Sequence, residues 1–179
     1  MSKKYELVVD DTITFWGWKL FRIKALISFG SVDAGDLGGY IYTEDNLSQK
    51  GDAWVSGNAK VWGNAEVSGD AKVWGNAKVS GDAKVWGNAE VWGNAEVWGN
   101  AEVSGDAKVS DFEDVIVFKN HWSSGRHFTY TKSNKMWRVG CFYGTGQELI
   151  DKAYRDSEKS GNYYKAYVEF IAYLEGLGE

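Results

Sequence analysis

The protein has 179 residues, of which 44% are hydrophobic and 25% charged, and its formal net charge is −5. This is the composition of a soluble, foldable chain, and no apolar run approaches the roughly 20 residues of a membrane helix. The charge is spread evenly along the chain, so no basic region is available to follow a phosphate backbone, and direct nucleic-acid binding is not expected.

The chain contains one cysteine, Cys141, which excludes an internal disulfide framework and a thiolate zinc site. The first residues lead into a strand-like segment without the long apolar run of a signal peptide. We therefore expect a cytoplasmic protein without membrane contact, and we predict neither a cofactor nor a metal site.

Residues 1–46 are predicted to form a β-rich cap. Alternating apolar residues indicate strands over 5–9, 12–15 and 18–27, and a segment rich in glycine and aspartate then leads to Ile41. The segment that follows is a repeat whose open end needs a cover, and the cap supplies it.

A six-residue repeat occupies residues 55–110. Valine stands at every sixth position from Val55 to Val109, and the valines up to Val103 are followed by Trp or Ser, Gly, Asn or Asp, Ala, and Lys or Glu. The Ala-x-Val part alternates small apolar and outward-facing residues, which is typical of a short strand. The Gly-Asn or Gly-Asp pair is a turn that accepts positive φ. Each repeat thus predicts one flat side and one corner of a solenoid.

Three sides make a triangular coil, so we expect the coils to stack eighteen residues apart. The side chains favour this period over a period of twelve. Stacked eighteen apart, Lys72, Glu90 and Lys108 alternate in charge, as neighbouring strands prefer. Stacked twelve apart, Asp70 would lie directly on Asp82. We predict a triangular solenoid of about three coils within residues 47–110.

These repeats resemble those of the hexapeptide-repeat family, whose fold is a left-handed parallel β-helix. The resemblance implies that fold for residues 47–110, in a mainly β protein. Acyltransferases of this family use a histidine base, and its carbonic anhydrases bind zinc through three histidines. This repeat contains no histidine, and the two histidines of the chain, His121 and His127, lie outside it. We therefore expect a protein that is not an enzyme.

Residues 111–179 are predicted to form a small α+β unit of three strands and two helices. The predicted strands are 115–119, 127–132 and 135–143, with a hairpin turn at residues 133–134. Thr145 and Glu148 have the spacing of a capping box and start a helix that extends to about residue 159. Residues 160–162 (Ser-Gly-Asn) interrupt it, and a second helix follows over 163–175.

Short segments on both sides of the repeat resemble uncharacterised phage and prophage proteins of Gram-positive bacteria. They are LFRIKAL at 20–26, GDLGGYI at 35–41, EDNLS at 44–48, GDAWV at 51–55 and GCFYGT at 140–145. The resemblance implies the cytoplasm of a bacterial host and supplies no activity. Small phage proteins often counteract host defences, anti-CRISPR proteins included, so a host protein is the implied partner.

The tryptophans of the repeat are the strongest functional signal. In the triangular coil, Trp74 and Trp92 stack on one outer face, which also carries Trp54. Trp62 and Trp98 share the second face, and Trp86 is alone on the third. Exposed tryptophans this close together exceed what a monomer usually leaves uncovered. Three covers are consistent with the sequence: the C-terminal unit, a second copy of the chain in a homodimer or trimer, or a foreign protein. We hypothesise a non-enzymatic binding protein that engages a host protein through these faces and forms a homo-oligomer.

The alternative is binding of a nucleotide or another small ligand, or an acyltransferase-like activity, in the C-terminal unit or between subunits. Gly144, Thr145 and Gly146 lead into a predicted helix whose N-terminus could hold an anion. Arg126 and His127 lie at the end of a predicted loop in the same unit. An ordinary capped turn explains residues 144–146 more simply, and a purely structural rod is a third alternative.

Overall fold

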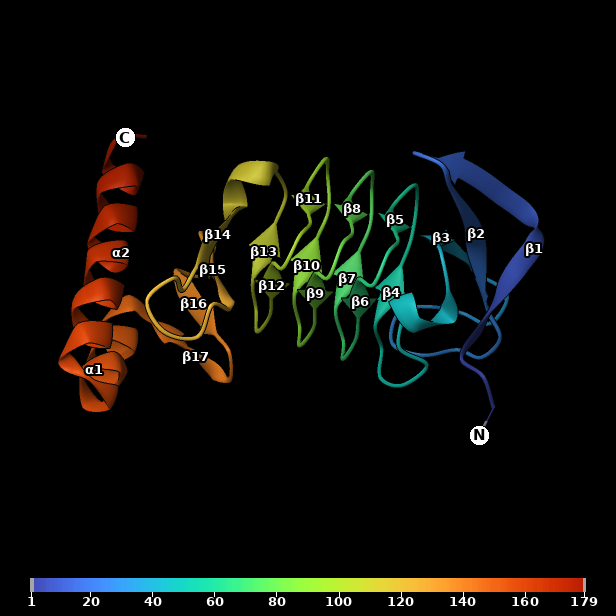
Figure 1. Ribbon diagram of the computed structural model, residues 1–179. Helices are drawn as coiled ribbons and strands as arrows, with labels where there is room; N and C mark the ends of the chain where they lie inside the picture. The colour runs from blue at the N-terminus through green and yellow to red at the C-terminus, as the bar shows by residue number, and fades with distance from the viewer. Residues whose placement is uncertain (1, 179) are drawn as a thin grey trace.

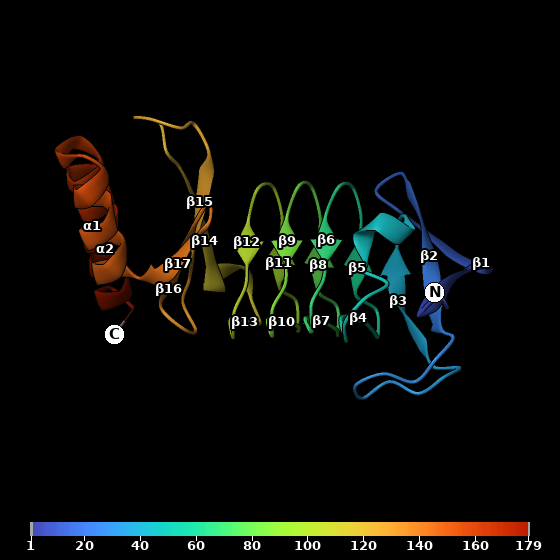
Figure 2. The same cartoon turned by 90° about the horizontal axis from the view of Figure 1, so that it is seen from below.

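The computed structural model describes residues 2–178 and shows a parallel β-solenoid with a different cap at each end (Figures 1 and 2). Ten two-residue strands in this part of the chain form its sides: β4 (Trp54–Val55), β5 (Lys60–Val61), β6 (Glu66–Val67), β7 (Lys72–Val73), β8 (Lys78–Val79), β9 (Lys84–Val85), β10 (Glu90–Val91), β11 (Glu96–Val97), β12 (Glu102–Val103) and β13 (Lys108–Val109). Each coil pairs in parallel with the coil eighteen residues further along, as Lys60 does with Lys78, and Lys78 with Glu96. The predicted mainly β fold and its eighteen-residue register are confirmed.

The solenoid begins one coil before the repeat. Strand β3 (Leu37–Ile41) pairs in parallel with β5, and Leu47 forms a bridge with Val67. The parallel sheets therefore contain about four coils rather than three. The first coil uses residues that the sequence predicted as part of the cap.

Alanine and valine of every repeat fill the interior of the solenoid. All of them from Ala53 to Val109 are at most 1% exposed and belong to one continuous core. Burying a valine side chain contributes on the order of 1.5–3 kcal/mol, so this column is the main source of stability. Outward side chains pair across the coils, with Lys78 Nζ 2.7 Å from Glu96 Oε1.

Outside the two-residue strands, the repeated hydrogen bonds between the coils run in one direction. Lys60 N donates to Ala77 O, and Lys78 N donates to Ala95 O, both at 2.9 Å. At these positions the first coil therefore presents carbonyls, and the last coil amides, without a further coil to bind them. Because unpaired backbone groups are costly when buried, each cap has to supply partners.

Side chains of the N-terminal segment and of the first coil supply donors to carbonyls that lack a strand partner. Asn46 Nδ2 donates to Gly63 O at 3.1 Å and to Ala65 O at 2.8 Å. Lys4 Nζ donates to Ala53 O at 2.9 Å, and burial lowers the pKa of this amine to about 8. Two side chains thus replace part of a missing coil.

The rest of the N-terminal cap is a hairpin of β1 (Tyr5–Phe15) and β2 (Trp18–Ala25), and β2 also pairs with β3. The sequence predicted two strands, over 5–9 and 12–15, where the structure has one. The pairing shifts register between Val8 and Thr12. Such a bulge bends a strand without ending it, which explains the difference.

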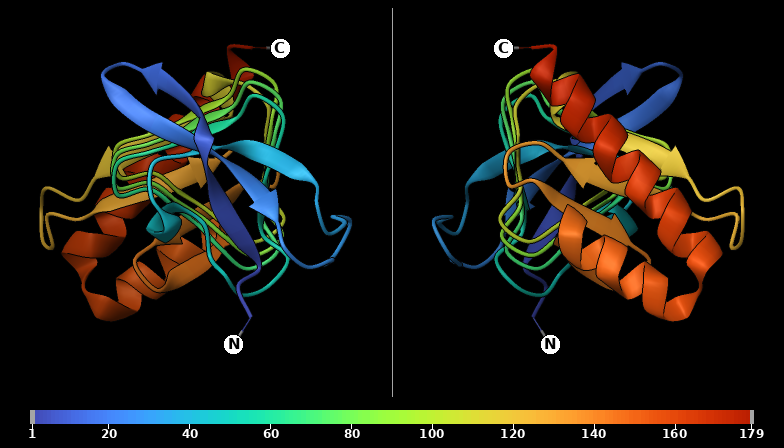
Figure 3. Two further views of the ribbon diagram at one scale, coloured as in Figure 1. Left: turned by 90° about the vertical axis from the view of Figure 1, so that its right-hand side faces the viewer. Right: turned by 90° about the vertical axis from the view of Figure 1, so that its left-hand side faces the viewer.

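The C-terminal cap is an antiparallel sheet backed by two helices. Its strands are β14 (Val115–Lys119), β15 (His127–Thr131), β16 (Met136–Val139) and β17 (Phe142–Thr145), in this order across the sheet. The sheet lies between the end of the solenoid and the helices α1 (Gly146–Asp156) and α2 (Glu158–Gly176) (Figures 1 and 3). Thr129 Oγ1 and Ser133 Oγ accept hydrogen bonds from the amides of Glu102 and Lys108 in the last coil, at 2.9 and 2.8 Å.

Two predictions about this cap are wrong. The segment 135–143, predicted as one strand, is a hairpin in which Gly140 turns the chain with φ +57°, so the unit has four strands rather than three. The helices meet at Ser157 rather than at residues 160–162, because Ser157 caps α2. Gly161 lies inside α2, where the ring of Tyr154 fills the space of a side chain. Neither helix in residues 2–178 is long and apolar enough to span a membrane.

Replacing Gly81 with alanine will destabilise the solenoid more than the same change at Gly99. Both glycines turn a corner with positive φ, +71° and +66°, where alanine costs roughly 1–2 kcal/mol. A Cβ on Gly81 would also lie 2.9 Å from the Gly99 nitrogen of the next coil, whereas a Cβ on Gly99 meets no atom within 4 Å. We expect the thermal midpoint of Gly81→Ala, followed by circular dichroism, to be lower by at least about 2–4 °C. Equal midpoints would contradict the close stacking of the corners.

Replacing Asn46 with alanine will lower the free energy of unfolding by about 2–4 kcal/mol, since several buried backbone groups lose their partner. These groups are Gly63 O and Ala65 O of the second coil and the amide of Thr43, whereas the amide of Tyr42 keeps its hydrogen bond to Val61 O. Asn58→Ala is the matched control, because that side chain is exposed and donates one long hydrogen bond of 3.5 Å. Chemical denaturation of both variants measures the difference. If Asn46→Ala lowers the free energy of unfolding by less than about 0.5 kcal/mol, water forms hydrogen bonds to these backbone groups as well as Asn46 does.

Candidate functional site

The N-terminal cap removes two of the predicted interface tryptophans from the surface. Trp54 is 7% exposed against the rings of Tyr5 and Phe29, and Trp62 is 6% exposed beside Phe15. Their cover is the cap, which was not among the three covers expected from the sequence. Trp54 is therefore lost as a contact residue, and Trp62 contributes only a small part of its ring to the wall of a cavity of about 210 Å³.

Trp74 and Trp92 stack as predicted. Their ring centroids are 5.2 Å apart and the ring planes differ by 9°, and both side chains are half-buried. Each ring covers one face of the other. The C-terminal cap closes the end of the solenoid and does not fold back along this side (Figure 1). The pair therefore offers less apolar surface than two separate rings.

Trp98 remains 66% exposed and lies in the middle of an apolar groove. Towards the N-terminal cap it borders a cavity of about 210 Å³ that Trp16 also lines. Towards the C-terminal cap it borders a cavity of about 580 Å³ that Phe112 and Val117 also line. Trp16 and Phe112 are themselves 72% and 65% exposed. We call this surface, from Trp16 through Trp98 to Phe112 and Val117, the Trp98 groove.

Three separate elements build the Trp98 groove. Trp98 follows β11, in the same sheet as Trp62 after β5, so the prediction that these two share a face is confirmed. Trp16 stands at the tip of the β1–β2 hairpin, and its ring lies 5.7 Å from Lys78 Nζ. Phe112 belongs to a 3-10 turn, Phe112–Asp114, between the solenoid and β14.

Sequence reasoning did not single out Trp16 or Phe112 as surface residues. The signal for Trp16 was its place beside Gly17 in a tight turn, where polar residues are usual. The signal for Phe112 was its position between two acidic residues, directly after the last repeat. Both residues lie outside the repeat, in segments that extend beyond the outline of the coils. The pattern of the repeat does not predict where such segments lie.

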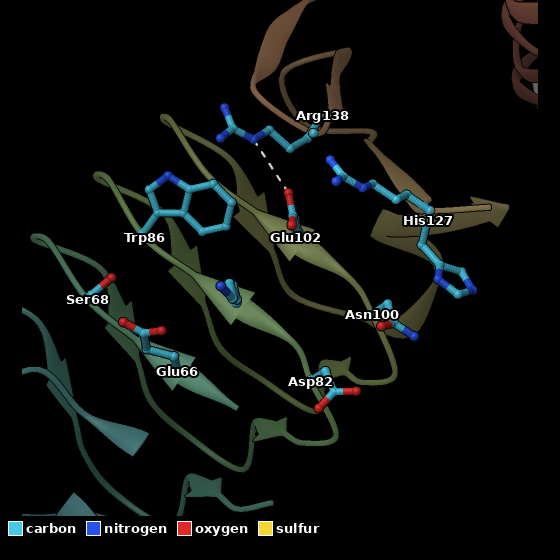
Figure 4. Close-up of a pocket in the computed structure, with 11 residues that line it drawn as sticks. Glu66, Ser68, Asp82, Trp86, Asn100, Glu102, His127 and Arg138 are labelled. Carbon is cyan, nitrogen blue, oxygen red and sulfur yellow. Dashed lines mark ion pairs between the residues drawn. The ribbon is translucent and has the colours of Figure 1, made fainter. Parts of the chain in front are cut away.

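A second hollow lies on the third face, where the C-terminal sheet overhangs Trp86 (Figure 4). This Trp86 cleft has a volume of about 600 Å³, and Arg126 and His127 line it as well. Arg138 on β16 extends over it, with its Cζ 4.9 Å from the centroid of the Trp86 ring and its Nε 3.5 Å from Glu102 Oε2. Sequence reasoning missed Arg138, because only the strand register places it above Trp86.

The charges around the Trp86 cleft cancel. Its three cations are Lys84, Arg126 and Arg138, and its three carboxylates are Glu66, Asp82 and Glu102. Lys84 lies between Glu66 and Glu102 in the register of β6, β9 and β12. The cleft therefore offers an aromatic surface and hydrogen-bonding groups, but no excess positive charge to attract a phosphate.

The predicted anion site at residues 144–146 is filled by the protein's own carboxylate. Glu148 Oε2 accepts hydrogen bonds from Thr145 N at 2.8 Å and from Thr145 Oγ1 at 3.0 Å. These hydrogen bonds lower the pKa of Glu148 below its usual value. Gly144, Thr145 and Gly146 line neither of the cavities that contain Arg126 and His127. The structure thus separates the two halves of the predicted ligand site.

The described residues and the comparisons with known proteins offer no further candidate for a catalytic or metal site. No group of three or more His, Cys, Asp or Glu side chains in residues 2–178 is arranged to hold a metal ion. No protein-family model matches the chain, and no curated protein matches it significantly. The two hollows beside the solenoid therefore carry the functional argument.

Neither ATP nor acetyl-CoA will raise the melting temperature of the protein, because the Trp86 cleft has no net positive charge and the α1 N-terminus is already occupied. A ligand at about 100 times its Kd stabilises the native state by roughly 2.7 kcal/mol, which a thermal-shift measurement resolves. Arg126→Ala is the matched variant. A shift in the wild-type protein that disappears in Arg126→Ala would contradict this prediction and assign the cleft to an anionic ligand.

Proposed function

We propose that the protein is a non-enzymatic binding protein that engages another protein through the Trp98 groove. The observation that carries this proposal is the 66% exposure of Trp98 between two apolar cavities. Large aromatic side chains in concave apolar surfaces are the residues that dominate the affinity of protein–protein interfaces. An exposed apolar surface of this kind is typical of a contact site rather than of a bare monomer.

The construction of the groove supports the same function. Its floor belongs to strands fixed by the eighteen-residue ladder, and the Lys78–Glu96 ion pair of 2.7 Å lies in it. A partner therefore meets a preformed surface, and little backbone ordering is needed on binding. The Trp86 cleft, by contrast, is lined mainly by charged and polar side chains that water solvates well.

The proposed class of partner rests on a resemblance of short sequence segments. The resemblance of residues 35–41, 44–48 and 140–145 to phage and prophage proteins supports a bacterial host protein, and a counter-defence role is the setting that such a partner suggests. A second copy of the chain on the same groove is the alternative occupant, and it corresponds to the homo-oligomer expected from the sequence.

Trp98→Ser tests this proposal without disturbing the coil, because Ser80 holds the equivalent place one coil earlier. Affinity capture from bacterial lysate identifies the partner, and binding is then measured with both purified proteins. We expect Trp98→Ser to bind at least about 30-fold more weakly, the loss typical of an interface hot spot of about 2 kcal/mol. The double variant Trp74→Ser/Trp92→Ser is the matched control and is expected to bind like the wild type.

Two outcomes would overturn the proposal. Equal binding by Trp98→Ser and the wild type would remove the groove from the interface. Capture of untagged copies of the chain alone, lost in Trp98→Ser, would assign the groove to self-association instead.

A further inference from the structure

Strand β14 is a free edge of the C-terminal sheet. It pairs with β15 and with no other described strand, and in the right-hand view of Figure 3 it lies at the margin of the sheet. Lys132 N donates to Asp114 O in this ladder, and the groups of alternate residues in an antiparallel strand point in opposite directions. The amides and carbonyls of Val115, Val117 and Lys119 therefore face away from β15.

These outward groups have no other backbone partner. Within residues 2–178, no hydrogen bond reaches the backbone of Val115, Val117 or Lys119 from outside the sheet. Natural edge strands are usually protected by proline, a bulge or a charge in the middle of the strand. Strand β14 has the sequence VIVFK, with strong β propensity and its charge at the end. It is an open template for one more strand.

An apolar cavity lies beside β14 on each face of the sheet. On the solenoid face, Val115 and Val117 line the 580 Å³ cavity of the Trp98 groove. On the helix face, Ile116 lines a cavity of about 270 Å³ together with Ile171 and Leu174 of α2, and Glu113, Lys132 and Glu175 border it. The side chains of an added strand alternate between the two faces. Both cavities are therefore placed to receive side chains of the same segment, as in other strand-addition sites.

We propose that the partner of the Trp98 groove presents an extended segment that pairs with the outer edge of β14. The inference rests on the proposed function and names the part of the partner that is recognised. The segment carries large apolar side chains at neighbouring positions, one for the cavity on each face. Asp111 and Glu113 are exposed at one end of β14 and Lys119 at the other, so a basic residue of the segment lies beside Asp111 and Glu113.

A foreign segment suits this edge better than a second copy of β14. When two identical edge strands pair in antiparallel fashion around a twofold axis, the two sheets join into one, and the solenoid faces of both copies point to the same side of it. Both solenoids would then lie next to each other on one side of the joined sheet. A single extended segment brings no second solenoid to that side and needs no room beside the first.

Selection from a displayed library of random peptides of about ten residues, the length of a long strand, tests this inference with the intact protein as bait. We expect the enriched peptides to carry large apolar residues at neighbouring positions, one for each cavity, and to carry Lys or Arg at one end. Val117→Pro should bind them at least about 10-fold more weakly, because proline removes an outward amide and leaves the hydrogen bonds to β15 in place. Val117→Ile, which keeps the amide and an apolar side chain, is the matched control and should bind like the wild type.

Hydrogen exchange of the wild-type protein gives a second measurement that does not depend on the folding of a variant. The bound peptide should slow exchange of the Val115, Val117 and Lys119 amides. One outcome would retain the groove and overturn strand addition. In that outcome Trp98→Ser abolishes peptide binding, whereas Val117→Pro binds like the wild type and the bound peptide does not slow exchange of these amides. Peptides bound equally by the wild type and Trp98→Ser would overturn the groove itself.

Two further outcomes concern the occupant. Failure to enrich any peptide would overturn recognition of an extended segment, while lysate capture would still test the groove. A dimer of the wild-type protein that Val117→Pro dissociates, seen by light scattering, would assign the edge to a second copy.

Discussion

The hydrogen-bond ladder between coils eighteen residues apart is the constraint on which the rest of the structure depends. Each coil satisfies its neighbour, so neither end of the solenoid is complete by itself. Asn46 and Lys4 complete one end, and Thr129 and Ser133 the other. Because both ends are covered, another molecule cannot extend the ladder and has to meet the sides of the solenoid.

The caps also determine which sides can bind. A flat side of a solenoid has no hollow of its own, but both caps extend beyond the outline of the coils (Figure 3). The overhang of the N-terminal hairpin and of the turn before β14 forms the Trp98 groove, and the overhang of Arg138 forms the Trp86 cleft. The same hairpin buries Trp54 and Trp62. The caps that close the two ends of the solenoid therefore have two effects. They bury some of the tryptophans, and they create the concave surfaces beside the coils.

The sequence predicts the repeat well because its determinants are local. The buried valine of each side and the glycine of each corner follow from six residues, and the alternation of Lys72, Glu90 and Lys108 selects the eighteen-residue register. The caps are less predictable because their determinants are contacts between distant segments. The hairpin at Gly140, the burial of Trp62 and the position of Arg138 over Trp86 all depend on how a cap lies on the coil.

The fold itself does not require tryptophan at position 98. The residue after valine in each repeat is serine or tryptophan, and the coil accommodates both: Ser56, Trp62, Ser68, Trp74, Ser80, Trp86, Trp92, Trp98, Ser104 and Ser110. The structure gives most of these tryptophans a contact within the chain, since Trp62 packs under the cap, Trp74 and Trp92 stack, and Trp86 lies under Arg138. Trp98 stays 66% exposed where serine would satisfy the coil equally well. Its large apolar surface is therefore explained better by contact with another molecule than by the stability of the solenoid.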